Sequence, residues 1–137
     1  MEPEAILDTN VVLRHLLNDH PDHSPRATAY LRPVFTGERV LRLTDAVVSE
    51  LVFTLDRTYK VPRTAIHEFI MEFIDLPAVI LPGKALYRRT LQYWVEQPGL
   101  AFTDCQLLIL ADHSGIGAVV TFDRKMSRYP GVERIEP

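Results

Sequence analysis

The stretch Ala5-Ile6-Leu7-Asp8-Thr9-Asn10 decides the fold, because it joins a short apolar run to an acid and then to a helix start. We expect a strand over residues 5–7 that runs into Asp8, and a helix from Asn10 to about Asn18. A carboxylate at the end of a strand lies where ligands bind in open α/β sheets. The stretch therefore predicts both a fold class and the place of a site.

The rest of the chain repeats this alternation of strand and helix. Further strands are expected over 40–43, 79–81, 118–122 (buried) and 132–135 (an edge strand). A second helix is expected from Pro25 to Phe35, with Ser24 as its N-cap and with a last turn that Pro33 makes doubtful. Further helices are expected over 45–59, from Pro62 through Ile74, over 84–96, and from Thr103 to about Ser114. Alternating elements predict a mostly parallel sheet with helices on both faces, an α/β fold.

Composition limits the class of protein. The 137 residues are expected to form a single domain, and 47% apolar with 24% charged residues is ordinary for a globular chain. A net charge of −3 excludes a generally basic surface that coats nucleic acid, but it does not exclude a nuclease. With one cysteine, an acidic N-terminus unlike a signal peptide, and no apolar run near 20 residues, we expect a cytoplasmic protein.

Three more acids occupy positions comparable to Asp8. Glu50 lies inside the apolar run Val47–Val52, Asp104 opens a late helix, and Asp123 follows the strand that ends in Val120-Thr121-Phe122. Each has a plain alternative: a helix cap for Asp8, a first-turn residue for Asp104, a turn residue for Asp123 and a solvated side chain for Glu50. Together they predict one acidic cluster at the carboxyl edge of the sheet.

Clustered carboxylates are costly unless a cation neutralises them, so a shared divalent metal is expected. Mg²⁺ or Mn²⁺ prefers carboxylate and water oxygens, and such an ion polarises a phosphate oxygen and lowers the pKa of an attacking water. Thr9, Asn10 and Thr121 are polar neighbours suited to hydrogen-bonding the carboxylates or a metal-bound water, with local capping as the alternative.

At these residues the chain resembles the PIN-domain ribonucleases and, among them, the VapC-type toxins of toxin–antitoxin pairs. The likeness rests on four short motifs that occur in order along nearly the whole chain: Leu7–Asn10, Ser49–Val52, Phe102–Cys105 and Val120–Arg124. It implies a Rossmann-like three-layer α/β/α sandwich with a mostly parallel sheet of about five strands. It also implies Mg²⁺- or Mn²⁺-dependent hydrolysis of RNA phosphodiester bonds.

Carried over by position, the resemblance assigns the metal-binding and catalytic roles to Asp8, Glu50, Asp104 and Asp123. It further implies a homodimer that is silenced by a small cognate antitoxin, in a larger assembly with it. Because Arg124 stands where some relatives carry another acid, the resemblance leaves open whether one or two metal ions bind.

Basic and aromatic residues complete the expectations. Arg124, Lys125 and Arg128 follow the last acid, and Arg14 lies one helical turn after Asn10. We expect these four to bind RNA phosphates, with a solvated loop or, for Arg14, an antitoxin carboxylate as the alternative. Phe53, Phe69 and Phe73 are expected mainly in the core. Some of this apolar surface, together with Tyr93 and Trp94, is the candidate for a dimer or antitoxin interface instead.

Two other functions compete with the nuclease. A phosphohydrolase with Asp8 as covalent nucleophile needs a second acid two positions later, where Asn10 stands. A catalytically inactive PIN-like module that binds RNA or protein has no use for an intact set of clustered acids. The metal-dependent endoribonuclease is therefore the leading hypothesis.

Overall fold

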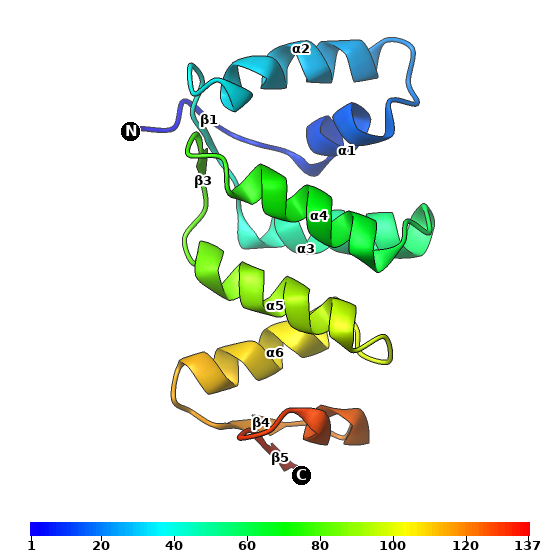
Figure 1. The fold of residues 1–137 in the computed structure, drawn as a ribbon, viewed down its shortest axis with the longest axis vertical. Coiled ribbons are helices and arrows are strands. Elements are labelled where there is room, and N and C mark those ends of the chain that lie inside the picture. Colours follow the sequence, from blue (N-terminus) through cyan, green and yellow to red (C-terminus); the bar gives the residue numbers. More distant parts are fainter. The chain divides into compact units, whose positions relative to one another are not determined.

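A computed structural model describes all 137 residues of the chain (Figure 1). The chain divides into two compact units, Met1–Pro82 and Gly83–Pro137. Each unit is described by itself below, as unit 1 and unit 2.

Unit 1 carries the N-terminal stretch with its strand, its acid and its helix. Its elements are β1 (Ala5–Ile6), α1 (Thr9–Leu17), α2 (His23–Phe35), β2 (Leu41–Arg42), α3 (Asp45–Phe53), the π-helical turn η1 (Thr54–Thr58), α4 (Arg63–Ile74) and β3 (Val79–Ile80). The three strands form one parallel sheet in the order β1-β2-β3. Their carboxyl ends therefore lie at one edge of the sheet, and α1 and α3 both begin just beyond it.

Helix packing in unit 1 holds that edge in place. α1 packs against both α2 and α3, and α4 packs against η1 and β3 (Figure 1). The apolar side chains between these elements are almost completely buried: Val12, Leu31, Leu41, Val48, Leu51, Ile66, Ile70 and Val79. Full burial of one such side chain contributes about 1.5–3 kcal/mol to the free energy of unfolding. The core thus fixes the starts of α1 and α3 relative to each other.

Unit 2 is a helix hairpin followed by two strands. Its elements are α5 (Lys84–Glu96), α6 (Phe102–His113), β4 (Ala118–Val120), the 3₁₀-helix η2 (Arg124–Arg128) and β5 (Glu133–Ile135). β4 and β5 pair in parallel, and α6 packs against both α5 and β4. Gly115 and Gly117, with φ of 78° and 72°, reverse the chain between α6 and β4. Since the connection is short, β4 runs back along α6, and its carboxyl end lies toward the start of that helix.

The predicted elements are present, and all five strands pair in parallel, as the alternation predicts. Several details differ. The helix expected over 45–59 divides into α3, which ends at Phe53, and the π-helical turn η1 over Thr54–Thr58. α2 begins at His23, and Ser24 accepts a hydrogen bond from the His20 N–H (3.0 Å) instead of capping the helix. Pro33 lies inside the last turn of α2, which continues to Phe35, so the doubt about that turn was misplaced.

The expected burial is wrong at three aromatic or apolar positions. Val120 and Phe122, in the run predicted as a buried strand, are 65% and 73% exposed, and β4 ends at Val120. Phe53, predicted for the core, is 62% exposed. Trp94, in contrast, is fully buried and packs edge-to-face on Phe102, so it lies in the core rather than at an interface.

No helix combines the length and apolar character needed to cross a membrane.

Candidate active site

Asp8 occupies the N-cap position of α1, yet its side chain makes no capping hydrogen bond. Its backbone is extended (φ −87°, ψ 150°), as is usual for the residue that precedes a helix. The residue is exposed, directly after the buried Leu7. The capping alternative is therefore wrong for Asp8, and its carboxylate oxygens are available to a ligand.

Glu50 is held by a residue next to Asp8. Thr9 Oγ1 donates a hydrogen bond of 3.0 Å to Glu50 Oε2, which links the first turn of α1 to α3. Thr9 is only 2% exposed, whereas Glu50 is exposed. The buried hydroxyl thus fixes one oxygen of a carboxylate that otherwise faces solvent, so Glu50 is not a freely solvated side chain.

Asp104 lies in the first turn of α6, but the helix starts one residue earlier than expected. α6 begins at Phe102, and Asp104 Oδ2 accepts a hydrogen bond from the Ala101 N–H at 3.0 Å. The expected helix start at Thr103 is therefore wrong, because the Asp104 carboxylate binds the N–H of Ala101, the N-cap residue of α6. The second oxygen, Oδ1, takes no part in that contact.

Asp123 follows the carboxyl end of β4 and caps η2. Its own N–H donates to Thr121 Oγ1 (3.1 Å), and its Oδ1 accepts from the Lys125 N–H (3.0 Å). Lys125 Nζ lies 3.9 Å from Asp123 Oδ2, a weak surface ion pair. Thr121 thus orients the backbone of Asp123, and Lys125 contacts its carboxylate from the following turn.

Each unit therefore gathers one pair of the predicted acids. In unit 1, Asp8 follows the carboxyl end of β1, and Thr9 ties Glu50 to the same edge. In unit 2, Asp104 and Asp123 lie toward the same end, because β4 runs back along α6. Within neither unit do three or more His, Cys, Asp or Glu side chains form a group that holds a metal ion. A shared cluster of all four acids stays a prediction.

The donor atoms of both pairs suit a hard divalent cation. All four groups are carboxylates, the ligands that Mg²⁺ and Mn²⁺ prefer. Asp8 makes no capping hydrogen bond, and the contacts of Glu50 with Thr9 and of Asp104 with Ala101 each use one oxygen of two. The residues present therefore fit the metal that the resemblance implies.

The predicted RNA-binding residues are on the surface of their units. Arg124, Lys125 and Arg128 all lie on η2 and are exposed. Arg14 pairs with Asp19 at 2.8 Å and donates a longer hydrogen bond of 3.4 Å to the Tyr59 hydroxyl. These contacts are exposed and leave guanidinium N–H groups of Arg14 open to other partners.

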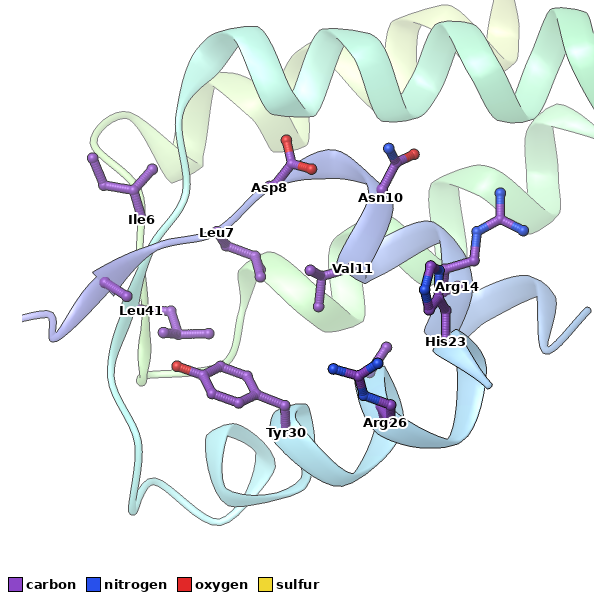
Figure 2. Close-up of a pocket in the computed structure, with 12 residues that line it drawn as sticks. Ile6, Leu7, Asp8, Asn10, Val11, Arg14, His23, Arg26, Tyr30 and Leu41 are labelled. Atoms are coloured by element: carbon purple, nitrogen blue, oxygen red, sulfur yellow. The ribbon is translucent and has the colours of Figure 1, made fainter. Parts of the chain in front are cut away.

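A pocket of about 510 Å³ lies in unit 1 beside Asp8 (Figure 2). We call it the α1–α2 pocket, and its lining residues are Ala5, Ile6, Leu7, Asp8, Asn10, Val11, Arg14, His23, Arg26, Ala27, Tyr30 and Leu41. Figure 2 shows Asp8 and Asn10 on one side of Leu7 and Val11, with Tyr30 and Arg26 on the other. The sequence analysis missed the contribution of α2, although positions 23, 26, 27 and 30 have the spacing of one helix face.

The family model described as PIN domain matches residues 5–132, a span that includes parts of both units. The chain belongs to the PIN-domain family. PIN domains have a three-layer α/β/α fold, in agreement with the predicted fold class and with the parallel strands and six α-helices found here.

A curated relative supports the finer resemblance. The protein named VapC ribonuclease from Aquifex aeolicus (strain VF5) is 25% identical over 132 residues, which cover 96% of this chain and 96% of the relative. The resemblance to VapC-type PIN domains that the four motifs predict is thereby confirmed.

Proposed function

We propose that this PIN domain is a metal-dependent endoribonuclease that hydrolyses RNA phosphodiester bonds, the toxin of a type II toxin–antitoxin pair. The observation that carries the proposal is the match of the PIN-domain family over residues 5–132 to a chain with all four acids in order. The full-length similarity to a protein named VapC ribonuclease supports the same activity. We further propose that residues 1–137 act as one domain.

The proposed metal ligands and catalytic acids are Asp8, Glu50, Asp104 and Asp123. A bound Mg²⁺ or Mn²⁺ supplies charge stabilisation at the phosphate and an activated water. The chain's own residues prepare that chemistry: Thr9 holds the Glu50 carboxylate, and Thr121 holds the backbone of Asp123. We propose that Asn10 contributes a further hydrogen bond beside Asp8.

Substrate binding is assigned to the basic residues. We propose that Arg14 in unit 1 and Arg124, Lys125 and Arg128 on η2 bind phosphates of the RNA backbone. Guanidinium and ammonium groups on an otherwise acidic chain provide the local positive field that a polyanion needs. Such contacts position the strand and carry no base specificity of their own.

The proposed biological setting is that of VapC-type toxins. We propose a cytoplasmic homodimer that is inhibited by a cognate antitoxin protein and forms a larger assembly with it. The similarity to a VapC ribonuclease supports this setting.

The decisive experiment is cleavage of single-stranded RNA by the purified protein with Mg²⁺, with Mn²⁺, and with EDTA. We expect cleavage only with a divalent ion, and its loss in Asp8→Asn and Asp104→Asn. Glu50→Gln should lose cleavage as well, and its matched control is Glu72→Gln, which neutralises an exposed acid on α4 and should retain parental activity.

Removing a like charge from an acid pair relieves repulsion, so the inactive variants should unfold at the parental urea concentration or slightly above it. Cleavage at the parental rate by Asp104→Asn would overturn the assignment of this residue. Absence of calorimetric Mn²⁺ binding together with absence of cleavage would identify an inactive PIN-like module instead.

A further inference from the structure

Gly99 lies in the turn between α5 and α6, and the guanidinium of Arg128 packs closely against it. A β-carbon built on Gly99 would lie 2.8 Å from Arg128 Nη1 and 3.7 Å from both Cζ and Nη2. A real β-carbon does not approach another atom that closely, so any larger residue at this position displaces the guanidinium. Both residues belong to unit 2, so the contact is internal to that unit.

The turn itself does not require a glycine. The Leu100 N–H donates a hydrogen bond of 3.0 Å to the Gln97 carbonyl and closes a turn with Pro98 and Gly99 at its centre. The other five glycines of the chain have φ between 72° and 87°, whereas the φ of Gly99 lies outside the left-handed region. A turn without positive φ accepts most residue types at this place. The approach of Arg128 therefore accounts for the missing side chain.

The helix that carries Arg128 is fixed at both ends. Asp123 caps the start of η2, and Tyr129 follows its last residue, Arg128. The Tyr129 hydroxyl donates a hydrogen bond to Asp112 (2.7 Å) and accepts one from Arg89 (3.0 Å). Arg128 thus starts from an anchored backbone, and its side chain ends against the turn at Gly99. A group that is ordered before binding loses little conformational entropy when it meets its ligand.

The guanidinium of Arg128 is available to an anion. The residue is exposed and forms no salt bridge, whereas Lys125 on the same helix lies 3.9 Å from Asp123 Oδ2. Arginine offers two parallel N–H donors that match the geometry of a phosphate. Among the cations of η2, Arg128 therefore combines a fixed position with free donors.

The contact lies close to the acid pair of unit 2. Asp104 Oδ2 accepts a hydrogen bond from the Ala101 N–H, and Ala101 follows Gly99 by two residues. Two residues of extended chain span at most about 7 Å. Arg128 follows Asp123 by five residues of a 3₁₀-helix, a rise of about 10 Å. These separations suit a phosphate that flanks the bond to be cut rather than the phosphate at that bond.

We propose that Gly99 is a positioning residue for RNA binding: it lets Arg128 lie against the α5–α6 turn, where the guanidinium binds a phosphate next to the one that the acids cut. The inference rests on the proposed function and deepens it. It separates Arg128, which is held in place before RNA binds, from Arg124 and Lys125, which do not contact this turn.

The test measures binding separately from cleavage. A short fluorescein-labelled single-stranded RNA of mixed sequence is titrated into protein that carries Asp8→Asn in unit 1, which is expected to bind without cutting. Fluorescence anisotropy gives the dissociation constant. Arg128→Ala should raise Kd about tenfold and lower the slope of log Kd against log salt by about 0.7, the value for one phosphate contact on a single strand. Arg128→Lys keeps the charge and should keep the parental slope.

Gly99→Ala should raise Kd roughly 3- to 10-fold, because the guanidinium stays in the chain but leaves its place at the turn. In an Arg128→Ala background the same change should have no further effect. In an Arg124→Ala background, which lacks another arginine of η2, Gly99→Ala should weaken binding by its full factor. Alanine restricts the unfolded chain, so Gly99→Ala should unfold at the parental temperature or slightly above it.

Cleavage kinetics separate positioning from catalysis. With saturating Mn²⁺, Gly99→Ala should raise KM by about the factor seen in Kd and leave kcat within about twofold of the parental value, since a flanking phosphate is bound equally in the ground and transition states. A loss confined to kcat would contradict the proposed place of the phosphate.

The outcomes separate this inference from the proposed function. If Gly99→Ala binds RNA like the parent, or weakens binding equally in the Arg128→Ala background, Gly99 does not act through Arg128, and the nuclease proposal is unaffected. If the unmutated protein never cuts RNA, but the effects of Gly99→Ala and Arg128→Ala on binding are coupled, the positioning role stands and the proposed function fails.

Discussion

Replacing Thr9 by valine removes the hydroxyl that holds Glu50 while it preserves the shape of a buried side chain. Thr9 is 2% exposed, and its Oγ1 donates the 3.0 Å hydrogen bond to Glu50 Oε2. In Thr9→Val the carboxylate of Glu50 remains exposed, so water replaces the lost donor. The free energy of unfolding should therefore fall by only about 0.5–1.5 kcal/mol, the net value of one hydrogen bond.

The effect on catalysis should be larger than this loss of stability suggests. A glutamate without its partner regains rotamer freedom, and fixing such a side chain costs up to about 1.5–2 kcal/mol. If Glu50 must be ordered again in each reaction, kcat/KM should fall about tenfold, since 1.4 kcal/mol corresponds to one factor of ten. Single-turnover cleavage of RNA with saturating Mn²⁺ measures this change directly.

Three controls make the Thr9 prediction specific. Thr9→Ser keeps a hydroxyl and should retain most of the activity. Thr90→Val removes the hydroxyl of a similarly buried threonine, which donates to the Leu86 carbonyl within α5, and should change stability but not cleavage. In a Glu50→Ala background, which lacks the acceptor, Thr9→Val should have much less effect on the free energy of unfolding. Parental cleavage by Thr9→Val, or an equal loss in both backgrounds, would refute the positioning role of Thr9.

Two further predictions concern pH. Burial lowers the pKa of His15, whose Nδ1 lies 2.8 Å from Thr28 Oγ1, so the unfolded chain takes up a proton near pH 6.5 that the folded chain resists. The free energy of unfolding should therefore fall as the pH drops through 6.5. In urea titrations of His15→Gln, the free energy of unfolding should depend less on pH over this range. Hydrogen bonds from Tyr129 (2.7 Å), the larger cause, and from Arg89 lower the pKa of the Asp112 carboxyl. The ionised carboxyl therefore stabilises the fold above its ordinary pKa of 3.8, and this contribution is lost as the pH falls through the lowered value. In Tyr129→Phe the carboxyl resonance of Asp112 should titrate at higher pH by NMR, and an unchanged titration would contradict the assigned cause.

Element types were predictable where glycine and proline set the boundaries. The helix expected over 84–96 has those bounds in the structure, because Gly83 precedes it with a φ of 79° and Pro98 follows it closely. The start of α6 was less predictable. Thr103 has the residue type of a cap, but Asp104 reaches back to Ala101, and the two interpretations differ only in how one carboxylate turns.

Burial was predicted less well than element type, for a reason that β4 illustrates. The run 118–122 is almost wholly apolar, which favours a strand buried on both faces. In the structure β4 ends at Val120, its residues Ala118 and Val119 are only half-buried, and Val120 and Phe122 are exposed. Apolar composition therefore predicted the strand, but it did not predict what covers each face.

In the candidate site, the positions of some acids were predictable from the sequence, whereas a contact between two helices was not. Asp8 and Asp123 were predictable because each follows the carboxyl end of a strand in the sequence itself. The partnership of Thr9 with Glu50 depends on how α1 and α3 are rotated against each other, and no local pattern encodes that rotation. The pocket-lining residues of α2 could have been predicted from their place at the border of its buried stripe.

The buried face of α2 is formed by Ser24, Ala27, Leu31 and Val34. His23, Arg26 and Tyr30 each precede a member of this stripe by one position, so they lie at its border, where a helix turns from core to solvent. Border positions are the ones at which an aromatic or cationic side chain can line a pocket without leaving the surface. Applied to α1, the same rule selects Val11 and Arg14, which border the buried residues Val12 and Leu13 and line the same pocket. The edge of an amphipathic stripe is therefore a more informative place to search for ligand-binding residues than the centre of either face.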